Sequence, residues 1–255
     1  MRYIIPTHVH LDHAGGASGL MELCTNAKLV IHPYGAAHMI DPSKLISGAS
    51  SVYGEEKFKA LYGEIKAINK DRVIQAPDGF KLNMNGREFE FLDTPGHARH
   101  HFCIYDRQSN GIFSGDTFGL SYPQLPTDAG RFIFATTTPV QFDPDALLNS
   151  IDKIMAKNPD QIYLTHFGQI SPTPDIVEQL KNSVKEFRNI AMESINSTEN
   201  RIEIINQGIQ NYLLQVLAEM GCNQDTEFQQ NVIKFDSLLN AQGIDFWLSK
   251  YHDDK

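Results

Sequence analysis

The sequence predicts an α/β layered fold followed by a helical C-terminal region. Up to about Ser171, short β-like runs alternate with loops and occasional helices, a pattern typical of layered α/β proteins. From Thr173 onward, apolar residues recur at steps of three and four, which is the period of amphipathic helices. We therefore predict two domains, spanning residues 1–172 and 173–255.

Short apolar or alternating runs predict the strands of the first domain. These runs are Lys28–Ile31, Asp71–Gln75, Phe80–Met84, Glu88–Leu92, Phe102–Tyr105, Gly111–Ser114 and Gln161–Leu164. Asn85 and Gly86 lie between two of these runs, and this dipeptide favours a tight hairpin turn because both residues tolerate positive φ.

Capping residues and proline mark the predicted helices. One helix is expected to begin at Asp143-Pro144 and another at Thr173-Pro174. The apolar stripe from Phe228 to Leu239 is expected to stop before Gly243, which leaves the only tryptophan, Trp247, in a separate short helix. The segment from Asp41 to Asn69 also has a helical pattern, and it is either a lid or a surface helix pair.

Charge and composition exclude some classes of function. Lysine and arginine number 22 and aspartate and glutamate number 31, for a formal net charge of −9. This acidic balance disfavours nucleic acid as a partner. No apolar run is long enough to span a bilayer, so we expect no membrane partner and a cytoplasmic location. The cysteines Cys24, Cys103 and Cys222 are far apart, which indicates no disulfide framework.

The segment His8-Val9-His10-Leu11-Asp12-His13 carries the clearest chemical signal. Residues two apart in an extended chain point the same way, so His8 and His10 are expected to converge on one metal ion. Asp12 and His13 follow at a turn and are placed to bind a second ion. Imidazole and carboxylate ligands together suit zinc, iron or manganese.

Three further donors follow predicted strands. His97 stands in Thr94-Pro95-Gly96-His97, Asp116 follows Ser114-Gly115, and His166 follows Leu164-Thr165. Loops at the ends of strands are held by the sheet, so they can present several ligands in register.

The ordered motifs H-x-H-x-D-H, T-P-G-H, G-D and T-H resemble the metallo-β-lactamase superfamily, in its dinuclear hydrolase branch. The chain is especially similar to glyoxalase II-like and lactonase-like members, from Thr7 to Gly168. The resemblance implies an αββα sandwich for residues 1–172 as the metal-binding domain. The first motif stands unusually close to the first residue, which predicts an N-terminally shortened sandwich. One hypothesis is that a partner chain, as in a homodimer, covers the exposed sheet edge.

The resemblance also implies a ligand set for two divalent metal ions, with zinc expected and iron or manganese as alternatives. His8, His10 and His97 would bind the first ion, Asp12, His13 and His166 the second, and Asp116 would bridge both. A hydroxide bridging the two ions would be the nucleophile. Asp12 and Asp116 are the expected catalytic residues, since Asp12 would orient the water or carry its proton.

These expectations predict a hydrolase that acts on a small-molecule ester, thioester or lactone. Penicillin and cephalosporin hydrolysis is disfavoured, because true zinc β-lactamases carry cysteine or serine where Asp116 stands. One alternative is a di-iron oxygen-binding or redox protein of the same fold, although such relatives commonly carry glutamate where His10 stands. A nucleic-acid-cleaving enzyme and a metal-binding remnant without activity are further alternatives.

Several residues near these motifs have two interpretations each. His100 and His101 follow His97 closely, and one of them either faces the site or is structural. Thr136–Pro139 either lines the substrate cleft or forms an ordinary loop before a helix. Tyr53 and Tyr122 are both candidates to present a phenol to an oxyanion, and the sequence does not choose between them.

Overall fold

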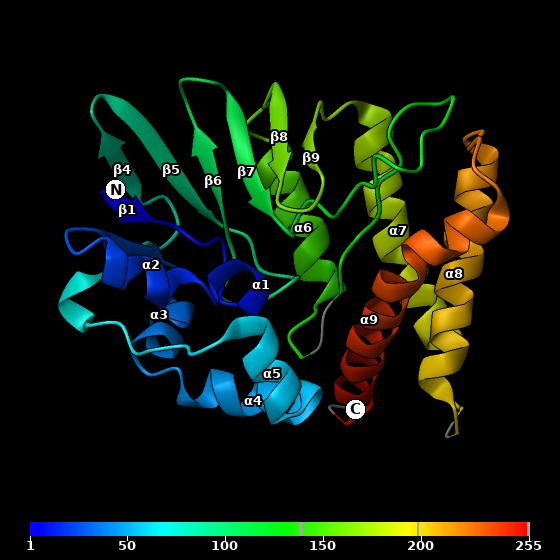
Figure 1. Ribbon diagram of the computed structural model, residues 1–255. Helices are drawn as coiled ribbons and strands as arrows, with labels where there is room; N and C mark the ends of the chain where they lie inside the picture. Colours follow the sequence, from blue (N-terminus) through cyan, green and yellow to red (C-terminus); the bar gives the residue numbers. More distant parts are fainter. Residues whose placement is uncertain (138–139, 198, 254–255) are drawn as a thin grey trace. The chain divides into compact units, whose positions relative to one another are not determined.

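The fold is described by a computed structural model that covers residues 1–137, 140–197 and 199–253 (Figure 1). Contacts divide the chain into two compact units. Unit 1 comprises Met1–Asp93 and His100–Arg107, and unit 2 comprises Thr94–Arg99 and Gln108–Lys255. The boundary expected between residues 172 and 173 stays a prediction.

Unit 1 begins with a parallel sheet. Its strands are β1 (Tyr3–Ile4), β2 (Lys28–Ile31) and β3 (Val73–Gln75), with β2 in the middle. Parallel strands require crossover connections, which are usually helical. Helices provide them here: α1 (Leu11–Ala14), α2 (Ala17–Leu23), α3 (Pro33–Ile40), α4 (Ser43–Tyr53), α5 (Glu55–Tyr62) and the 3₁₀ helix η1 (Lys70–Arg72). The helical pattern predicted between Asp41 and Asn69 is therefore confirmed as two helices, α4 and α5.

Unit 1 also contains three antiparallel strands, β4 (Lys81–Met84), β5 (Arg87–Asp93) and β6 (Phe102–Asp106). The turn between β4 and β5 has φ of 56° at Asn85 and 90° at Gly86, which confirms the predicted hairpin.

The strand β2 is buried on both faces, as its continuous apolar run predicts. Val30 belongs to a buried cluster with Phe91 and Phe102 of the antiparallel strands. Leu29 and Ile31 point the other way, into a second buried cluster that includes residues of α1, α2 and α3.

Unit 2 contains the strands β7 (Gly111–Gly115), β8 (Gln161–Leu164) and β9 (Gly168–Ile170). Strands β7 and β8 are parallel, and the helix α6 (Pro144–Met155) connects them. Strand β9 returns antiparallel to β8. The Asp143 carboxylate accepts a hydrogen bond from the backbone N–H of Ala146 at 2.9 Å, which confirms the predicted start of α6.

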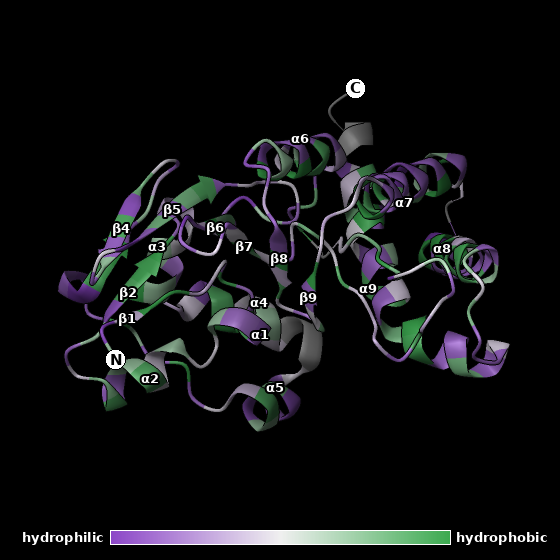
Figure 2. Ribbon diagram, turned by 90° about the horizontal axis from the view of Figure 1, so that it is seen from above, coloured by the Kyte–Doolittle hydropathy of each residue, from purple (hydrophilic) through white to green (hydrophobic). Residues whose placement is uncertain are grey.

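Three long helices complete unit 2: α7 (Pro174–Glu193), α8 (Arg201–Glu219) and α9 (Thr226–Asp253). They pack against one another, and hydrophobic and hydrophilic residues alternate along them (Figure 2). Their buried side chains include Val184, Phe187, Ile209 and Leu213, as the helical spacing predicts. Within the described residues, no helix combines the length and the apolar character needed to cross a membrane.

The predicted break at Gly243 is wrong, because α9 continues through it to Asp253. Phe228 and Phe235 of the predicted stripe are exposed, which corrects their expected place in the core, whereas Ala241, Ile244 and Leu248 beyond it are buried. Glycine inside a helix costs only about 1 kcal/mol relative to alanine, and burial of these apolar side chains outweighs that cost. Trp247 consequently belongs to the same helix as Phe228.

The helix α9 is fastened to the segment Ala135–Thr137 by the amide of Asn240. The backbone N–H of Thr137 donates to Asn240 Oδ1 at 2.7 Å, and Asn240 Nδ2 donates to the carbonyl of Ala135 at 3.1 Å. The Thr137 hydroxyl donates to the backbone carbonyl of Asn240 at 2.9 Å. Asn240 is 2% exposed, so these bonds are shielded from water.

We expect Asn240→Leu to destabilise the protein by roughly 2–4 kcal/mol, because it leaves a buried N–H and a buried carbonyl without their partner. Urea denaturation followed by circular dichroism measures the change. Asn231→Leu on the exposed side of α9 is the matched control, and an equal loss in both variants would contradict the role of the Asn240 amide.

Candidate metal centre

The histidine-rich segment of unit 1 follows the end of a strand and leads into a helix. Strand β1 ends at Ile4, and His8 and His10 lie in the loop that follows it. His10 is extended, with φ of −59° and ψ of 147°, and immediately precedes α1. Asp12 and His13 lie within α1.

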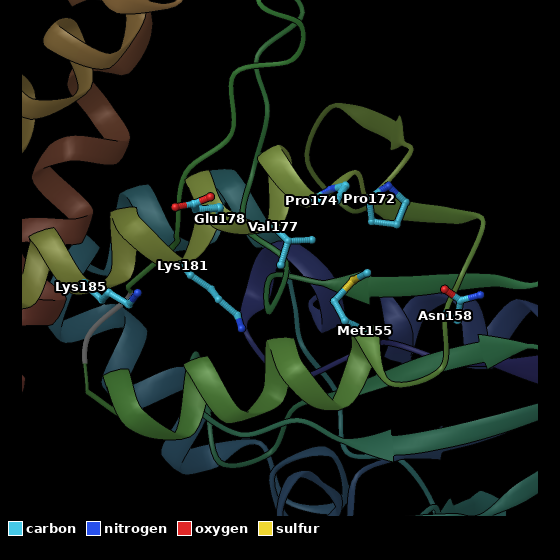
Figure 3. A pocket seen from close by; sticks show the side chains of 8 residues that line it. All are labelled: Met155, Asn158, Pro172, Pro174, Val177, Glu178, Lys181 and Lys185. Atoms are coloured by element: carbon cyan, nitrogen blue, oxygen red, sulfur yellow. The ribbon is translucent and has the colours of Figure 1, made fainter.

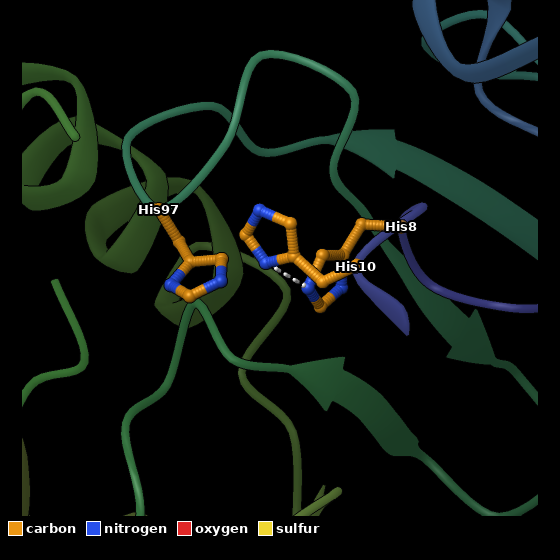
Figure 4. Close-up of side chains that lie close together, drawn as sticks. All are labelled: His8, His10 and His97. Atoms are coloured by element: carbon orange, nitrogen blue, oxygen red, sulfur yellow. Dashed lines mark hydrogen bonds between the residues drawn. The ribbon is translucent and has the colours of Figure 1, made fainter. Parts of the chain in front are cut away.

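His10 and His13 lie beside the buried ring of His8, and Asp12 lies beside His13. Nε2 of His8 lies 2.9 Å from Nδ1 of His10 (Figure 4), and the ring centroids of His8 and His13 are 4.0 Å apart. Nε2 of His13 is 3.2 Å from a carboxylate oxygen of Asp12, whose side chain is 51% exposed. Nδ1 of His8 lies 3.2 Å from the Thr7 hydroxyl, so that the other ring nitrogen, Nε2, faces His10.

His100 and His101 both pack against this group. Their ring centroids lie 6.1 and 4.9 Å from that of His8, and both residues are buried. Nδ1 of His100 accepts a hydrogen bond from the backbone N–H of Val9 at 3.5 Å. They therefore support the segment that carries the donors.

Unit 2 brings its three predicted donors together around Asp116. Each follows the end of a strand: His97 after β5, Asp116 after β7 and His166 after β8. One carboxylate oxygen of Asp116 lies 3.4 Å from Nε2 of His97, and the other lies 3.6 Å from Nε2 of His166. The carboxylate thus has a different histidine at each oxygen.

The residues present fit a divalent metal ion. Two ligand atoms bound at about 2.0–2.1 Å and at a tetrahedral angle lie roughly 3.3 Å apart. The Asp116–His97 and Asp116–His166 separations approach this value and are long for charge-assisted hydrogen bonds. All seven predicted donors take part in groups of histidine and aspartate side chains that can hold a metal ion.

Thr136 sets the orientation of the His97 ring, a role that the sequence did not indicate. Nδ1 of His97 lies 3.3 Å from the backbone carbonyl and 3.0 Å from the hydroxyl of Thr136. That hydroxyl itself donates to the carbonyl of Asp116 at 3.1 Å, so it accepts from His97. Nδ1 therefore carries the proton, and Nε2 keeps its lone pair on the side that faces Asp116.

Gly96 allows the His97 loop to lie directly on α6. Its φ is 127°, and a Cβ at this position would lie 2.3 Å from both Cα and N of Leu147. The loop is also held by hydrogen bonds: the Asp143 N–H donates to the Gly96 carbonyl at 2.8 Å, and the Ser150 hydroxyl donates to the Pro95 carbonyl at 2.6 Å. This close approach fixes the backbone that carries His97.

The turn that carries His166 is unusual in its backbone. Phe167 has φ of 74°, a conformation that is rare outside glycine, and Gly168 follows with φ of 98°. Arg131 donates to the carbonyl of Phe167 at 3.2 Å and to the Ser121 hydroxyl at 3.1 Å. The guanidinium thereby holds the turn in place.

Asp236 of α9 extends the group of charged residues in unit 2. Its carboxylate accepts a hydrogen bond from the Tyr122 hydroxyl. Burial raises the pKa of Asp236, the Tyr122 hydrogen bond and the charge of His166 lower it, and the charge of Asp116 raises it. Burial, followed by the contact with Asp236, raises the pKa of Tyr122, so its phenol stays protonated and acts as a donor.

The remaining candidates from the sequence have different outcomes. Tyr122 is placed beside Phe167, with ring centroids 4.5 Å apart, whereas the side chain of Tyr53 lies outside the described residues. Thr138 and Pro139 also lie outside them. The sequence missed the contact of Thr136 with His97 and the place of Asp236, because both depend on residues distant in the sequence.

A pocket of about 490 Å³ lies between α6 and α7 and is lined by Met155, Val177, Lys181 and Lys185, among others (Figure 3). Lys181 forms an ion pair with Asp152 of α6. Among the described residues, the lining includes none of the seven predicted donors.

The family model of the metallo-beta-lactamase superfamily matches residues 1–166. The chain belongs to this superfamily. Among the members of this superfamily, the chain is similar to the metallo-beta-lactamase fold-containing protein ST1585 of Sulfurisphaera tokodaii. The two are 26% identical over 174 residues, which cover 67% of this chain and 62% of ST1585. The crystal structure of ST1585 superposes with a TM-score of 0.63 at 22% identity, over 96% of this chain and 80% of that one, which confirms the predicted fold.

Two other superfamily relatives have names that state an activity. The acyl-coenzyme A thioesterase MBLAC2 of Bos taurus is 25% identical over 44% of this chain and 39% of its own length. The hydroxyacylglutathione hydrolase of Polaromonas sp. is 30% identical over 45% of this chain and 32% of its own length. The chain thus spans less than half of either relative.

We expect Gly96→Ala to destabilise the protein by about 2–5 kcal/mol, because it combines an unfavourable φ with a backbone collision at Leu147. Thermal unfolding and metal content by mass spectrometry measure the effect. Gly130 has a φ of 113° and open space around it, so Gly130→Ala shows the cost of the φ alone. A Gly96→Ala variant no less stable than this control would refute the packing argument.

We expect Thr136→Val to weaken metal binding by about tenfold, because the His97 ring loses its hydroxyl acceptor while the backbone carbonyl remains. Competition with a chromophoric chelator measures the affinity. Thr25→Val at an exposed position serves as the control, and unchanged affinity in Thr136→Val would show that this hydroxyl does not position His97.

Proposed function

We propose that the protein is a metal-dependent hydrolase that uses two divalent ions to cleave a small-molecule ester, thioester or lactone. The observation that carries this proposal is the carboxylate of Asp116, with Nε2 of His97 near one oxygen and Nε2 of His166 near the other. A carboxylate flanked in this way has the donors for two ions rather than one.

Membership of the superfamily supports the assignment of the ligands. His8, His10 and His97 would hold one ion, Asp12, His13 and His166 the other, and Asp116 both. Zinc suits these imidazole and carboxylate donors, and iron or manganese would be accepted by the same set.

When bound, a pair of divalent ions lowers the pKa of water and polarises a substrate carbonyl. The residues of the chain then orient the reactants and carry protons. Asp12 is half exposed beside His13, so its carboxylate can take a proton from the attacking water and release it to solvent. His97 is held as the Nδ1–H tautomer by Thr136 and contributes a neutral ligand.

A thioester is the favoured substrate class among the three. The names of two relatives specify acyl-coenzyme A and hydroxyacylglutathione, and both compounds are acylated thiol carriers. This chain spans under half of the length of either relative. The relatives therefore support thioester cleavage, but they do not indicate which thiol carrier this protein binds.

We expect the protein to contain two equivalents of metal, and its thioesterase activity to disappear on chelation and return on addition of Zn²⁺, Fe²⁺ or Mn²⁺. Asp116→Asn should lower kcat/KM by at least about 100-fold, because it removes the anionic ligand between the two ions. Elemental analysis and a panel of thioesters, esters and lactones measure these effects.

Asp160→Asn at an exposed position is the matched control and should leave both metal content and activity unchanged. A protein loaded with two equivalents of metal that hydrolyses none of the panel would refute the proposal. A coloured protein with iron that cycles between redox states would favour the di-iron alternative instead.

A further inference from the structure

A second pocket of unit 2 adjoins the loop that carries His97. Its volume is about 580 Å³, within the range of small-molecule sites. Three segments form it: the His97 loop through Pro95, Gly96 and Arg99, the entry to α6, and the C-terminal end of α9 through Trp247 and Lys250. We call it the α9 pocket.

The α9 pocket carries two cations in a protein with a net charge of −9. Arg99 and Lys250 line it, and the ammonium of Lys250 is held by a hydrogen bond to the Val140 carbonyl at 3.0 Å. The acidic residue in the lining, Asp143, is engaged as the N-cap of α6. Because the Asp143 carboxylate offsets the positive end of the helix α6, the positive charge of the pocket comes from the two side chains. This electrostatic setting suits an anion.

The lining of the same pocket also includes apolar rings. Trp247 and Phe142 line it together with the ring of Pro95. An indole stacks on planar rings, and nucleobases in particular gain from such stacking. The ligand that matches the α9 pocket thus combines an anionic group with a planar ring.

The position of the α9 pocket connects it to the chemistry of the donors. Its wall is the loop Thr94–Arg99, which the close packing of Gly96 on Leu147 keeps rigid. A molecule bound there lies against the backbone on either side of His97. The pocket is accordingly placed to hold the part of a substrate that does not react.

We propose that the α9 pocket binds the phosphorylated adenosine end of a thioester carrier, so that the substrate class is a nucleotide-bearing thioester such as an acyl-coenzyme A. This inference rests on the proposed thioesterase function. Adenine would stack on Trp247, and the phosphates would be bound by Arg99 and Lys250. Glutathione has carboxylates but no planar ring, and therefore matches only part of the pocket.

Binding is tested without catalysis, because Trp247 is the only tryptophan. Adenosine 3′,5′-bisphosphate should change its fluorescence saturably, and adenosine alone or pyrophosphate alone should bind at least tenfold more weakly. Arg99→Gln and Lys250→Gln should each weaken the bisphosphate at least tenfold, and Arg99→Lys should recover most of the affinity. Lys185→Gln, in the other pocket of the same unit, is the matched control.

The kinetic arm compares an acyl-coenzyme A with the same acyl group on N-acetylcysteamine, which lacks the nucleotide. Arg99→Gln and Lys250→Gln should raise KM for the former at least tenfold with little change in kcat, and should not affect the latter. Equal effects on both thioesters, or a fluorescence response that glutathione reproduces, would overturn the inference. If the metal-loaded wild-type protein hydrolyses no thioester, the proposed function is refuted. The fluorescence titration then still tests whether the pocket binds the bisphosphate.

Discussion

The close approach of Gly96 to the backbone of Leu147 is the constraint on which the position of the candidate metal donor His97 depends. A Cβ at residue 96 has no room there, so the chain passes α6 at the distance that only glycine allows. The hydrogen bonds from Asp143 and Ser150 lock the same contact. His97 thereby stands on backbone that cannot shift independently of α6.

A second line of support reaches His97 from the C-terminal helices. Asn240 of α9 holds Ala135 and Thr137, and Thr136 between them fixes the tautomer of His97. Because these groups are buried, a loss of one hydrogen bond costs more than it would at the surface. The helix α9 therefore supports the candidate site as well as the fold of unit 2, through Asn240 and Asp236.

The helix α9 also lines the α9 pocket, through Trp247 and Lys250. The loop that carries the candidate ligand His97 also forms the wall against which a carrier would bind, and a rigid loop would keep the two at a constant separation. The exposed cations Arg99 and Lys250 come from parts of the chain that are far apart in sequence. Their joint effect on an anion arises only because the His97 loop and the C-terminal end of α9 line the same pocket.

The sequence by itself indicated the candidate metal donors and determined most of the strands and helices. Histidine and aspartate at strand ends can be identified from residue type and spacing. Asn85-Gly86 and Asp143-Pro144 indicate a turn and a helix start, because preferences for φ and for helix capping depend on neighbouring residues alone. The break predicted at Gly243 failed because a local propensity of about 1 kcal/mol was outweighed by burial on either side. Only the tertiary structure decided the roles of Thr136, Asn240 and Asp236 and the lining of the α9 pocket. Each depends on contacts between distant segments, and such contacts leave no periodic signal in the sequence.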